Sequence, residues 1–272
     1  MSSQLDRAHL LQEASRQRTY AFWGPGGSGK STAMCLHPGK GFVIDSNRKL
    51  HEMRNLDDAT RKRITIWQPE AALAGEEIDV ATINPKKPDE GADGMWKVQP
   101  KGYEEIMQVT NDLLRLAYKC RTEGTPFPYD WVGHDSLTHT LMHLEQAVMA
   151  RHHKTVIPLA LYKVVKRDIL RYLEGWHRIS TVAKIDTILI AHSMPIYERD
   201  EEGAHKLLKY EPIVTGALRE TLFTDFTEVY FFRGGSSDGK WRVQTFNDSR
   251  AEARTSSKLE RIQVVDAKAF YD

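Results

Sequence analysis

Cysteines, long apolar runs and net charge are all scarce in this sequence. Cys35 and Cys120 are the only cysteines among 272 residues, too few and too far apart for a disulfide framework or a metal cluster. No segment approaches the roughly 18 consecutive apolar residues that a transmembrane helix needs. Residues 1–18 are polar and do not resemble a signal peptide. We therefore expect a soluble protein of the cytoplasm, with no membrane partner.

The charges of the chain almost cancel. Its 38 Lys and Arg side chains stand against 37 Asp and Glu side chains, which leaves a formal net charge of +1. Any nucleic-acid site must therefore be a local basic patch, because the chain has no overall positive field. An apolar share of 40% is enough for a substantial core, and the length suits one large α/β domain spanning residues 1–272.

One glycine-rich segment carries a complete G-x-x-x-x-G-K-[ST] motif, between an apolar run at 20–23 and a helix-compatible stretch. Glycines let a loop fold closely around an anion and point N–H groups at it, at the positive end of the following helix. We predict binding of a nucleoside triphosphate, with Lys30 at the β- and γ-phosphates and the Ser31 hydroxyl at Mg²⁺. The predicted contacts are Gly24, Pro25, Gly26, Gly27, Ser28, Gly29, Lys30, Ser31 and Thr32.

Short apolar runs alternate with helix-length segments along most of the chain. Strands are predicted at 20–23, 41–45, 64–67, 131–135 and 187–191. This alternation predicts a mostly parallel sheet with helices on both faces. Apolar residues recur at helical spacing in 103–120 and 159–179, which predicts two amphipathic helices.

The character of the sequence changes in three places. Apolar runs at 228–233 and 241–246 flank a Gly- and Ser-rich turn, which predicts an antiparallel hairpin at the sheet edge. Residues 75–102, rich in Pro, Gly, Lys and Asp, predict a mobile insert. The mixed charges of 194–209 predict a second mobile, polar loop. Residues 247–272 would form a C-terminal extension.

Asp135 is a candidate for the acid that holds Mg²⁺ in the nucleotide site. It ends the apolar run 131–135 and precedes a polar helix start near Leu137. An acid at such a strand tip holds Mg²⁺, usually through its water. The alternative interpretation is that Asp135 serves only as the N-cap of that helix. Many ring and packaging ATPases place their catalytic glutamate directly after this acid, whereas this chain has Ser136, which counts against those classes.

In the order of these elements the chain resembles the RecA-like ATPases, in particular the phage nucleotide-binding proteins of the Sak type that assist single-strand annealing and recombination. The resemblance covers most of the chain, from the phosphate loop through the strand ends at Asn47, Asp135 and His192. It implies a RecA-like P-loop core, ATP and Mg²⁺ as cofactors, and a homo-oligomer, ring or filament, on single-stranded DNA. A single-strand binding protein or an annealing protein is a further implied partner.

The resemblance also implies roles for individual residues. Asn47 stands where a glutamate would activate the attacking water, and Asn cannot accept a proton; Asp45 and Glu52 lie nearby in sequence. His192 stands where a polar residue senses the γ-phosphate, either neutral through a hydrogen bond or protonated through charge. It would pass the signal to a DNA-facing loop at 194–215. The implied DNA contacts are Arg199, Lys206, Lys209 and Tyr210.

Three cations after the last predicted strand complete the implied assembly. In RecA-like proteins this region projects positive charge into the nucleotide of the neighbouring subunit. The candidate residues are Arg250, Arg254 and Lys258. Both this segment and the loop at 194–215 fit equally well as plain solvent-facing charge.

Several functions therefore stay open. The first is an ATPase that acts in recombination on single-stranded DNA. The second is a nucleotide-regulated loader or replication accessory protein with little turnover, which Asn47 favours. A P-loop kinase that uses 75–102 as a lid and a DNA-packaging ATPase are the remaining alternatives. No guanine-reading N-K-x-D stretch is present, which favours ATP over GTP.

Overall fold

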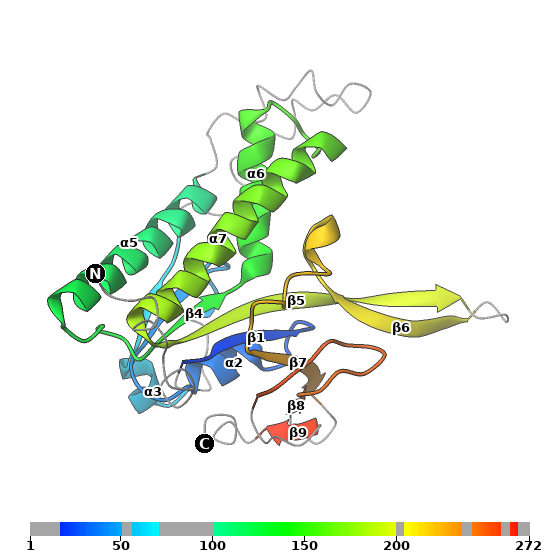
Figure 1. Ribbon diagram of the computed structural model, residues 1–272. Coiled ribbons are helices and arrows are strands. Elements are labelled where there is room, and N and C mark those ends of the chain that lie inside the picture. Colours follow the sequence, from blue (N-terminus) through cyan, green and yellow to red (C-terminus); the bar gives the residue numbers. More distant parts are fainter. Residues whose placement is uncertain are drawn as a thin grey trace, which may run out of the picture.

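A mixed sheet with helices on both faces forms the centre of the computed structural model (Figure 1). The structure describes residues 17–50, 56–70, 101–199, 204–235, 241–256 and 262–265. Within these residues the sheet has nine strands, and its main path runs β3-β2-β4-β5-β1-β7-β8-β9. None of the helices in the described part is both long and apolar enough to cross a membrane.

The strands up to β7 on this path are mutually parallel. They are β1 (Thr19–Gly24), β2 (Gly41–Asp45), β3 (Ile64–Trp67), β4 (Trp131–Asp135), β5 (Asp186–Arg199) and β7 (Glu228–Gly235). Next to β7 lies β8 (Trp241–Gln244), antiparallel to it, and then β9 (Ile262–Val265). The predicted parallel sheet and the C-terminal hairpin are therefore confirmed, and β9 adds a strand outside the hairpin.

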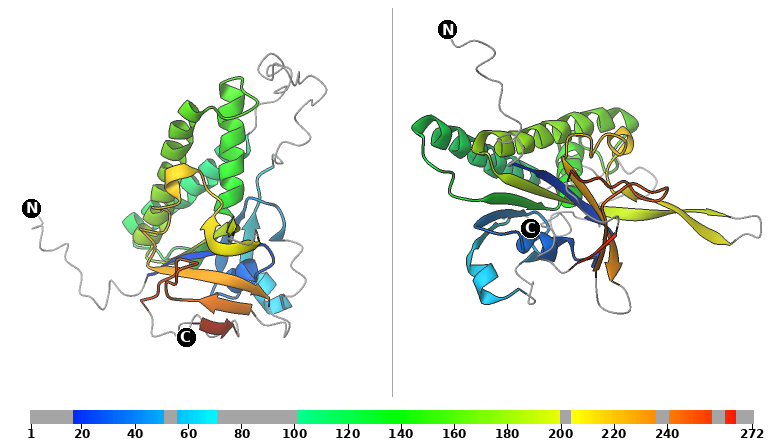
Figure 2. Two further views of the ribbon diagram at one scale, coloured as in Figure 1. Left: turned by 90° about the vertical axis from the view of Figure 1, so that its right-hand side faces the viewer. Right: turned by 60° about the horizontal axis from the view of Figure 1, so that its bottom comes forward.

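The helices have the bounds α2 (Lys30–Cys35), α3 (Asp58–Lys62), α5 (Gly102–Glu123), α6 (Leu137–Arg151) and α7 (Tyr162–Ala183), with 3-10 turns η5 (Leu159–Leu161) and η6 (Gly216–Leu218). The predicted helix at 103–120 is confirmed as α5. The helix predicted at 159–179 begins as η5 and becomes α-helical only at α7. Helices α5, α6 and α7 cover one face of the sheet, while α2 and α3 lie on the other (Figure 2).

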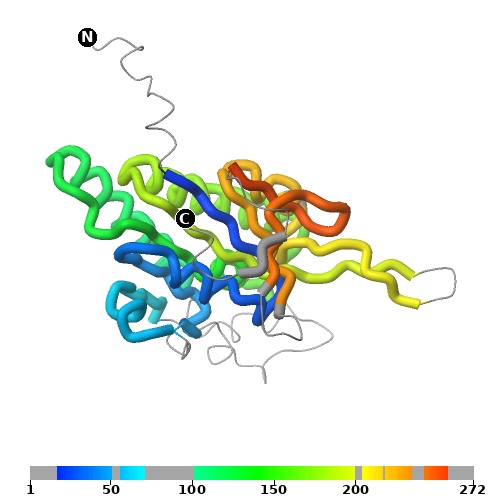
Figure 3. Tube along the Cα trace, turned by 90° about the horizontal axis from the view of Figure 1, so that it is seen from below, coloured from blue at the N-terminus to red at the C-terminus, as the bar shows by residue number. Residues whose placement is uncertain are grey.

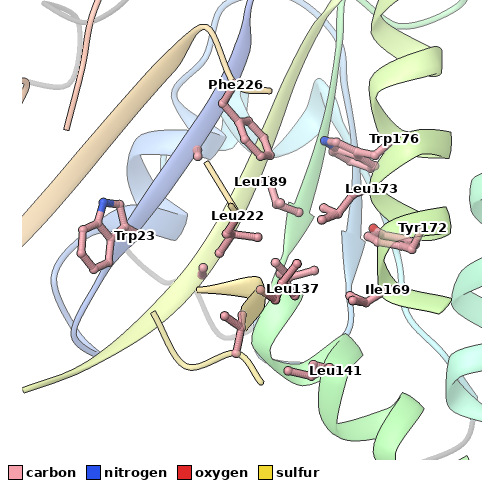
Figure 4. Packing of buried hydrophobic residues seen from close by; sticks show 14 of the residues in the cluster. Trp23, Leu137, Leu141, Ile169, Tyr172, Leu173, Trp176, Leu189, Leu222 and Phe226 are labelled. Carbon is pink, nitrogen blue, oxygen red and sulfur yellow. The ribbon is translucent and has the colours of Figure 1, made fainter. Parts of the chain in front are cut away.

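Alternation along the strands separates two apolar cores, because successive strand side chains point to opposite faces. In β1, Ala21 and Trp23 join the core under α5, α6 and α7, while Tyr20 and Phe22 join the core around α2. On the first face, α7 turns Ile169, Tyr172, Leu173 and Trp176 toward the sheet (Figure 4). Full burial of one such large side chain contributes about 3 kcal/mol, so this stripe fixes α7 on the sheet.

The segment 194–209 differs from the prediction. Instead of an irregular loop, its described residues form the two antiparallel strands of a projecting hairpin, the outer part of β5 and β6 (His205–Pro212) (Figure 3). Residues 200–203 lie outside the described part. Charged residues do not prevent strand pairing when both faces of the ribbon meet water, because the main-chain ladder is independent of side-chain charge. The insert predicted at 75–102 lies outside the described residues up to residue 100.

Candidate functional site

The polar residues predicted to form the nucleotide site lie at the carboxyl edge of the parallel strands. Strand β1 leads into the loop at 24–31, β2 ends at Asp45 and β4 ends at Asp135. Gly24 lies opposite His192 of β5, and Asp45 lies opposite Asp135. Parallel strands present their carboxyl ends at one edge, which is where open α/β sheets bind ligands. The fold therefore brings four separate sequence segments to one place.

Three glycines of the loop, Gly24, Gly27 and Gly29, have positive φ angles that side chains disfavour. Gly24 has a φ of 145°, and a Cβ built there would lie 2.3 Å from the carbonyl oxygen of Phe232 on β7. Gly29 has a φ of 90° and precedes α2, a backbone conformation that side chains disfavour. In the middle of the loop, a Cβ built on Gly26 or Gly27 meets no heavy atom within 4 Å. The loop is thus pinned at its ends and open along its centre, as an anion cradle needs to be.

Lys30 folds back across this loop. Its ammonium donates hydrogen bonds to the carbonyl oxygens of Gly24 (2.9 Å) and Pro25 (2.6 Å) and to the hydroxyl of Ser28 (3.1 Å). Burial lowers the pKa of Lys30 to about 8, and the nearby Asp135 carboxylate opposes this effect. A buried ammonium held by neutral oxygens gains when it exchanges them for an anion, because two opposite full charges attract each other more strongly than a charge and a carbonyl dipole.

The neighbouring Ser31 donates its hydroxyl hydrogen bond to the carboxylate of Asp135. Burial raises the pKa of Asp135 to about 6; the Ser31 bond opposes this, and the charge of Asp45 adds to it. A hydroxyl and a carboxylate are oxygen ligands of the kind Mg²⁺ takes. The helix α6 is capped by Ser136 rather than by Asp135, so Asp135 is not merely an N-cap. The Asp135–Ser136 peptide bond is cis.

Asn47 and Asp45 share the end of β2 but have different surroundings. The side-chain oxygen of Asn47 accepts the N–H of Lys49 (3.1 Å), within a local turn. Asp45 is fully buried, and its Oδ2 accepts the N–H of Leu50 (2.8 Å) and the Nε2 of Gln68 (2.7 Å). Its Oδ1 has no hydrogen-bond partner among the described residues. Asp45 is therefore the acid that the sheet places beside Asp135, while Glu52 lies outside the described residues.

His192 lies inside β5 and not at its end, because the strand continues to Arg199. Its N–H donates to the hydroxyl of Thr138 (3.0 Å), and its carbonyl oxygen accepts the N–H of Ile213 (2.8 Å). Its Nε2 is buried with no hydrogen-bond partner in the described part of the chain. Burial, and next the charge of Lys30, lower the pKa of His192 to about 4. Near neutral pH it is therefore an uncharged hydrogen-bonding group.

Three further residues hold the site together and were not singled out from the sequence. The Ser46 hydroxyl accepts the N–H of Ser136 (2.8 Å) and donates to its carbonyl (2.9 Å), which ties β2 to β4. Thr138 anchors His192, as described above. The ring of His139 meets that of His192 edge-on at 5.5 Å. Spacing along the chain carries no signal for these contacts, which exist only because three strands end together.

The four candidate DNA contacts divide into two pairs. Arg199 and Lys206 are exposed on the projecting hairpin. Lys209 is also exposed but forms an ion pair with Glu211 at 2.7 Å. Tyr210 lies where β6 returns to the body of the protein, and its ring packs 4.9 Å from that of Phe231. Its half-buried ring therefore packs against the body of the protein on one side, and its stacking role stays a prediction.

The three cations predicted to act on a neighbouring subunit also differ from one another in their surroundings. The guanidinium of Arg254 donates to the carbonyl oxygens of Phe223, Thr224 (2.9 Å) and Phe226 (2.5 Å) of its own chain. Arg254 pairs with Val229, which lies opposite Ala21 in the first half of the strands and away from the carboxyl edge. Arg254 therefore stabilises its own chain, which corrects its expected role at the nucleotide of a neighbouring subunit. Arg250 is exposed, and Lys258 lies outside the described residues.

The described residues contain no group of three or more His, Cys, Asp or Glu side chains placed to hold a metal ion. Ser31 and Asp135, the two residues predicted to bind Mg²⁺, provide two oxygen-bearing side chains in contact with each other. No protein-family model matches this sequence, and no curated protein sequence matches it either.

Proposed function

We propose that this chain is an ATP- and Mg²⁺-binding RecA-like ATPase that acts in recombination on single-stranded DNA as a homo-oligomer. The observation that carries the nucleotide part is the hydrogen bond between Ser31 and Asp135 beside the buried ammonium of Lys30. A chance glycine-rich turn gives no reason for an acid from a distant strand to meet the loop at this residue. The resemblance stated above supplies the DNA part.

In this proposal the loop and Lys30 bind the triphosphate. Lys30 leaves the carbonyls of Gly24 and Pro25 and turns to the β- and γ-phosphate oxygens, and the open centre of the loop receives the β-phosphate. Ser31 and Asp135 hold Mg²⁺, which neutralises charge on the phosphates when it is bound. His192, uncharged near neutral pH, offers its buried Nε2 as a hydrogen-bonding group on the side of β5.

Asp45 is the candidate general base. Asn47 cannot accept a proton, and Asp45 is the acid that the sheet register places beside Asp135. Its Oδ1 has no hydrogen-bond partner in the described residues, so that oxygen is available to accept a proton through a water molecule. Replacing Asp45 with Asn should lower the hydrolysis rate more than it lowers ATP affinity, if Asp45 acts in turnover.

The same observations favour a second function, a nucleotide-regulated loader or accessory protein with little turnover. Asn47 is held by its own turn, and Asp45 is fully buried with Oδ2 already bound twice. A site with no accessible base binds ATP well and hydrolyses it slowly. The two functions differ in whether single-stranded DNA accelerates hydrolysis.

The deciding experiment measures ATP binding, ATP hydrolysis and single-stranded DNA binding in the same samples at low salt. Wild type is compared with Lys30→Ala, and with Lys119→Ala as an exposed control on α5. Hydrolysis that DNA stimulates and that only Lys30→Ala abolishes supports the ATPase. ATP-dependent DNA binding without hydrolysis supports the loader. ATP binding with no effect of DNA on either activity rejects the recombination ATPase and leaves a loader that recruits a protein partner, or a kinase. Failure of ATP to bind rejects the nucleotide site itself.

A further inference from the structure

A second hollow lies beside this site, between α6, the beginning of α7 and the segment that follows β6. Its volume is about 700 Å³, and its walls include the apolar side chains of Leu141, Met142, Tyr162 and Val214. Sites that bind ligands commonly have volumes of about 300–1,000 Å³ and mostly apolar walls with a few polar groups. The nucleotide proposal gives this hollow no role.

The hollow is joined to His192 through the main chain. Thr138 and Ile213 both line it. They are also the two residues that bind the N–H and the carbonyl oxygen of His192, at 3.0 Å and 2.8 Å. His192 in turn lies opposite Gly24, the first residue of the phosphate loop. Anything that fixes or shifts the walls of the hollow therefore acts on a neighbour of the nucleotide site.

The charges of the lining favour an acidic occupant. Lys163 and Lys166, one helical turn apart on α7, have no ion-pair partner among the described residues. Arg219 is already held by Glu211 at 2.8 Å. Glu145, on α6, is the one acid in the lining, and burial raises its pKa. Carboxylates of an occupant are thus expected on the α7 side, at the two lysines.

The apolar surface extends past the hollow, which favours a polypeptide over a small molecule. Leu159 at the rim is 86% exposed and Met142 is 41% exposed. Val156, which precedes Leu159 in the connection between α6 and η5, is 69% exposed. A small ligand confined to the hollow would leave these side chains in water, whereas a chain that continues outward covers them. Large apolar side chains that are exposed around an apolar hollow are typical of protein contacts.

We propose that this hollow docks an acidic, amphipathic segment of a partner protein. A bulky apolar side chain of the segment enters between Met142, Tyr162 and Val214, and its carboxylates meet Lys163 and Lys166. Docking then alters ATP affinity through Thr138, Ile213 and His192. Only this last effect rests on the proposed function; the docking itself does not.

The test begins with selection of binders from a random peptide library, using the purified full-length chain without nucleotide. Enriched peptides should combine acidic residues with Leu, Phe or Trp. By fluorescence anisotropy, Leu159→Asp and the double variant Lys163→Glu/Lys166→Glu should each weaken their binding by about tenfold, the effect of losing one anchoring contact. Leu170→Asp and Lys119→Glu are matched controls, because both residues are exposed and lie outside the hollow.

Several outcomes overturn the docking proposal. They are enrichment of basic peptides, no enrichment at all, and peptide binding that the variants leave unchanged. The anionic dye 8-anilinonaphthalene-1-sulfonate is run alongside. If the dye binds in a Leu159- and Lys166-dependent way while no peptide does, the hollow is a small-molecule site and the proposal is wrong.

A second measurement tests the link to the nucleotide. Saturating peptide should shift the ATP dissociation constant, and Thr138→Val, which removes the hydroxyl that binds His192, should abolish most of that shift. Peptide binding without any ATP binding means that the nucleotide proposal has failed and the docking site stands. Peptide and ATP binding that do not influence one another mean that the proposed link through His192 is wrong.

Discussion

Strand β5 passes through two different environments within one element. Its first half, including Ile188, Leu189 and Ile190, lies buried between β1 and β4. Its second half pairs only with β6 in the described part of the chain, and there Tyr197 is 55% exposed. His192 stands at the boundary between the halves. Along the strand the sequence changes from an apolar run to a polar and charged one, and the neighbours change completely.

The comparison teaches that burial decides what a polar residue can do. At the buried edge, Lys30, Asp135 and His192 have shifted pKa values, because water is replaced by a few fixed groups. On the projecting hairpin, Arg199 and Lys206 keep their water and interact weakly within the chain. The first environment suits chemistry that needs fixed geometry, and the second suits contact with another molecule. Four predictions test this contrast, from the largest expected effect to the smallest.

Removing the buried charge of the loop should have the largest effect. Lys30→Ala is expected to weaken ATP binding by about a hundredfold, since one charge-assisted contact contributes up to about 3 kcal/mol. Isothermal titration calorimetry measures the loss. Thermal unfolding of the same variant shows whether the fold survives. Unchanged ATP affinity in a folded variant contradicts the role of the loop.

Two arginines of the C-terminal segment allow the same comparison between a residue bound within the chain and an exposed one. Arg254→Ala should lower the free energy of unfolding by about 2–3 kcal/mol, because the carbonyls of Phe223, Thr224 and Phe226 lose a charged donor. The exposed Arg250 is the matched control, and Arg250→Ala should change stability by less than about 0.5 kcal/mol. Urea unfolding measures both. If Arg254→Ala leaves stability intact but abolishes hydrolysis in mixed oligomers, the residue acts on a neighbouring subunit after all.

The neutral state of His192 predicts a loss of stability in acid. Its pKa is lowered from 6.5 to about 4 in the fold, so the stabilisation is complete above pH 6.5 and is lost as the pH falls toward 4. The expected loss is about 1–3 kcal/mol, since each pKa unit corresponds to about 1.4 kcal/mol. Urea unfolding across this range measures it, and His192→Gln should flatten the slope. His205→Gln on the hairpin is the control. An NMR titration of the His192 ring near its ordinary value contradicts the prediction.

The hairpin should show the smallest effect on stability and a selective effect on DNA. Arg199→Ala and Lys206→Ala are each expected to change the free energy of unfolding by less than about 0.5 kcal/mol. Each should weaken single-stranded DNA binding a few-fold and reduce the salt dependence by about one counterion. Anisotropy titrations at several salt concentrations measure this. Equal losses in Lys119→Ala, far from the hairpin on α5, would show that the effect is only one of net charge.

Local patterns predicted those elements that depend on neighbours in sequence. The loop at 24–31 was predicted because its glycines and Lys30 form one contiguous motif, and the parallel strands because each contains a short, mostly apolar run. The hairpin of β5 and β6 was missed because its strands carry mixed charge, and a ladder of main-chain bonds leaves no mark in side-chain hydropathy. For a related reason, nothing local in the sequence indicates that the ring of Tyr210 meets that of Phe231.

The sequence by itself determined the phosphate-loop motif, the alternation of strands and helices, and the two acids at strand ends. Those features follow from residue type and spacing alone. The tertiary structure decided which of them meet: Ser31 with Asp135, His192 with Thr138 and Ile213, and Arg254 with three carbonyls of its own chain. These contacts join residues far apart in sequence; those of Ser31 and His192 exist because the parallel strands meet at one edge, and those of Arg254 exist because the C-terminal segment pairs with β7. The same packing buries the groups involved, and burial sets their charge states.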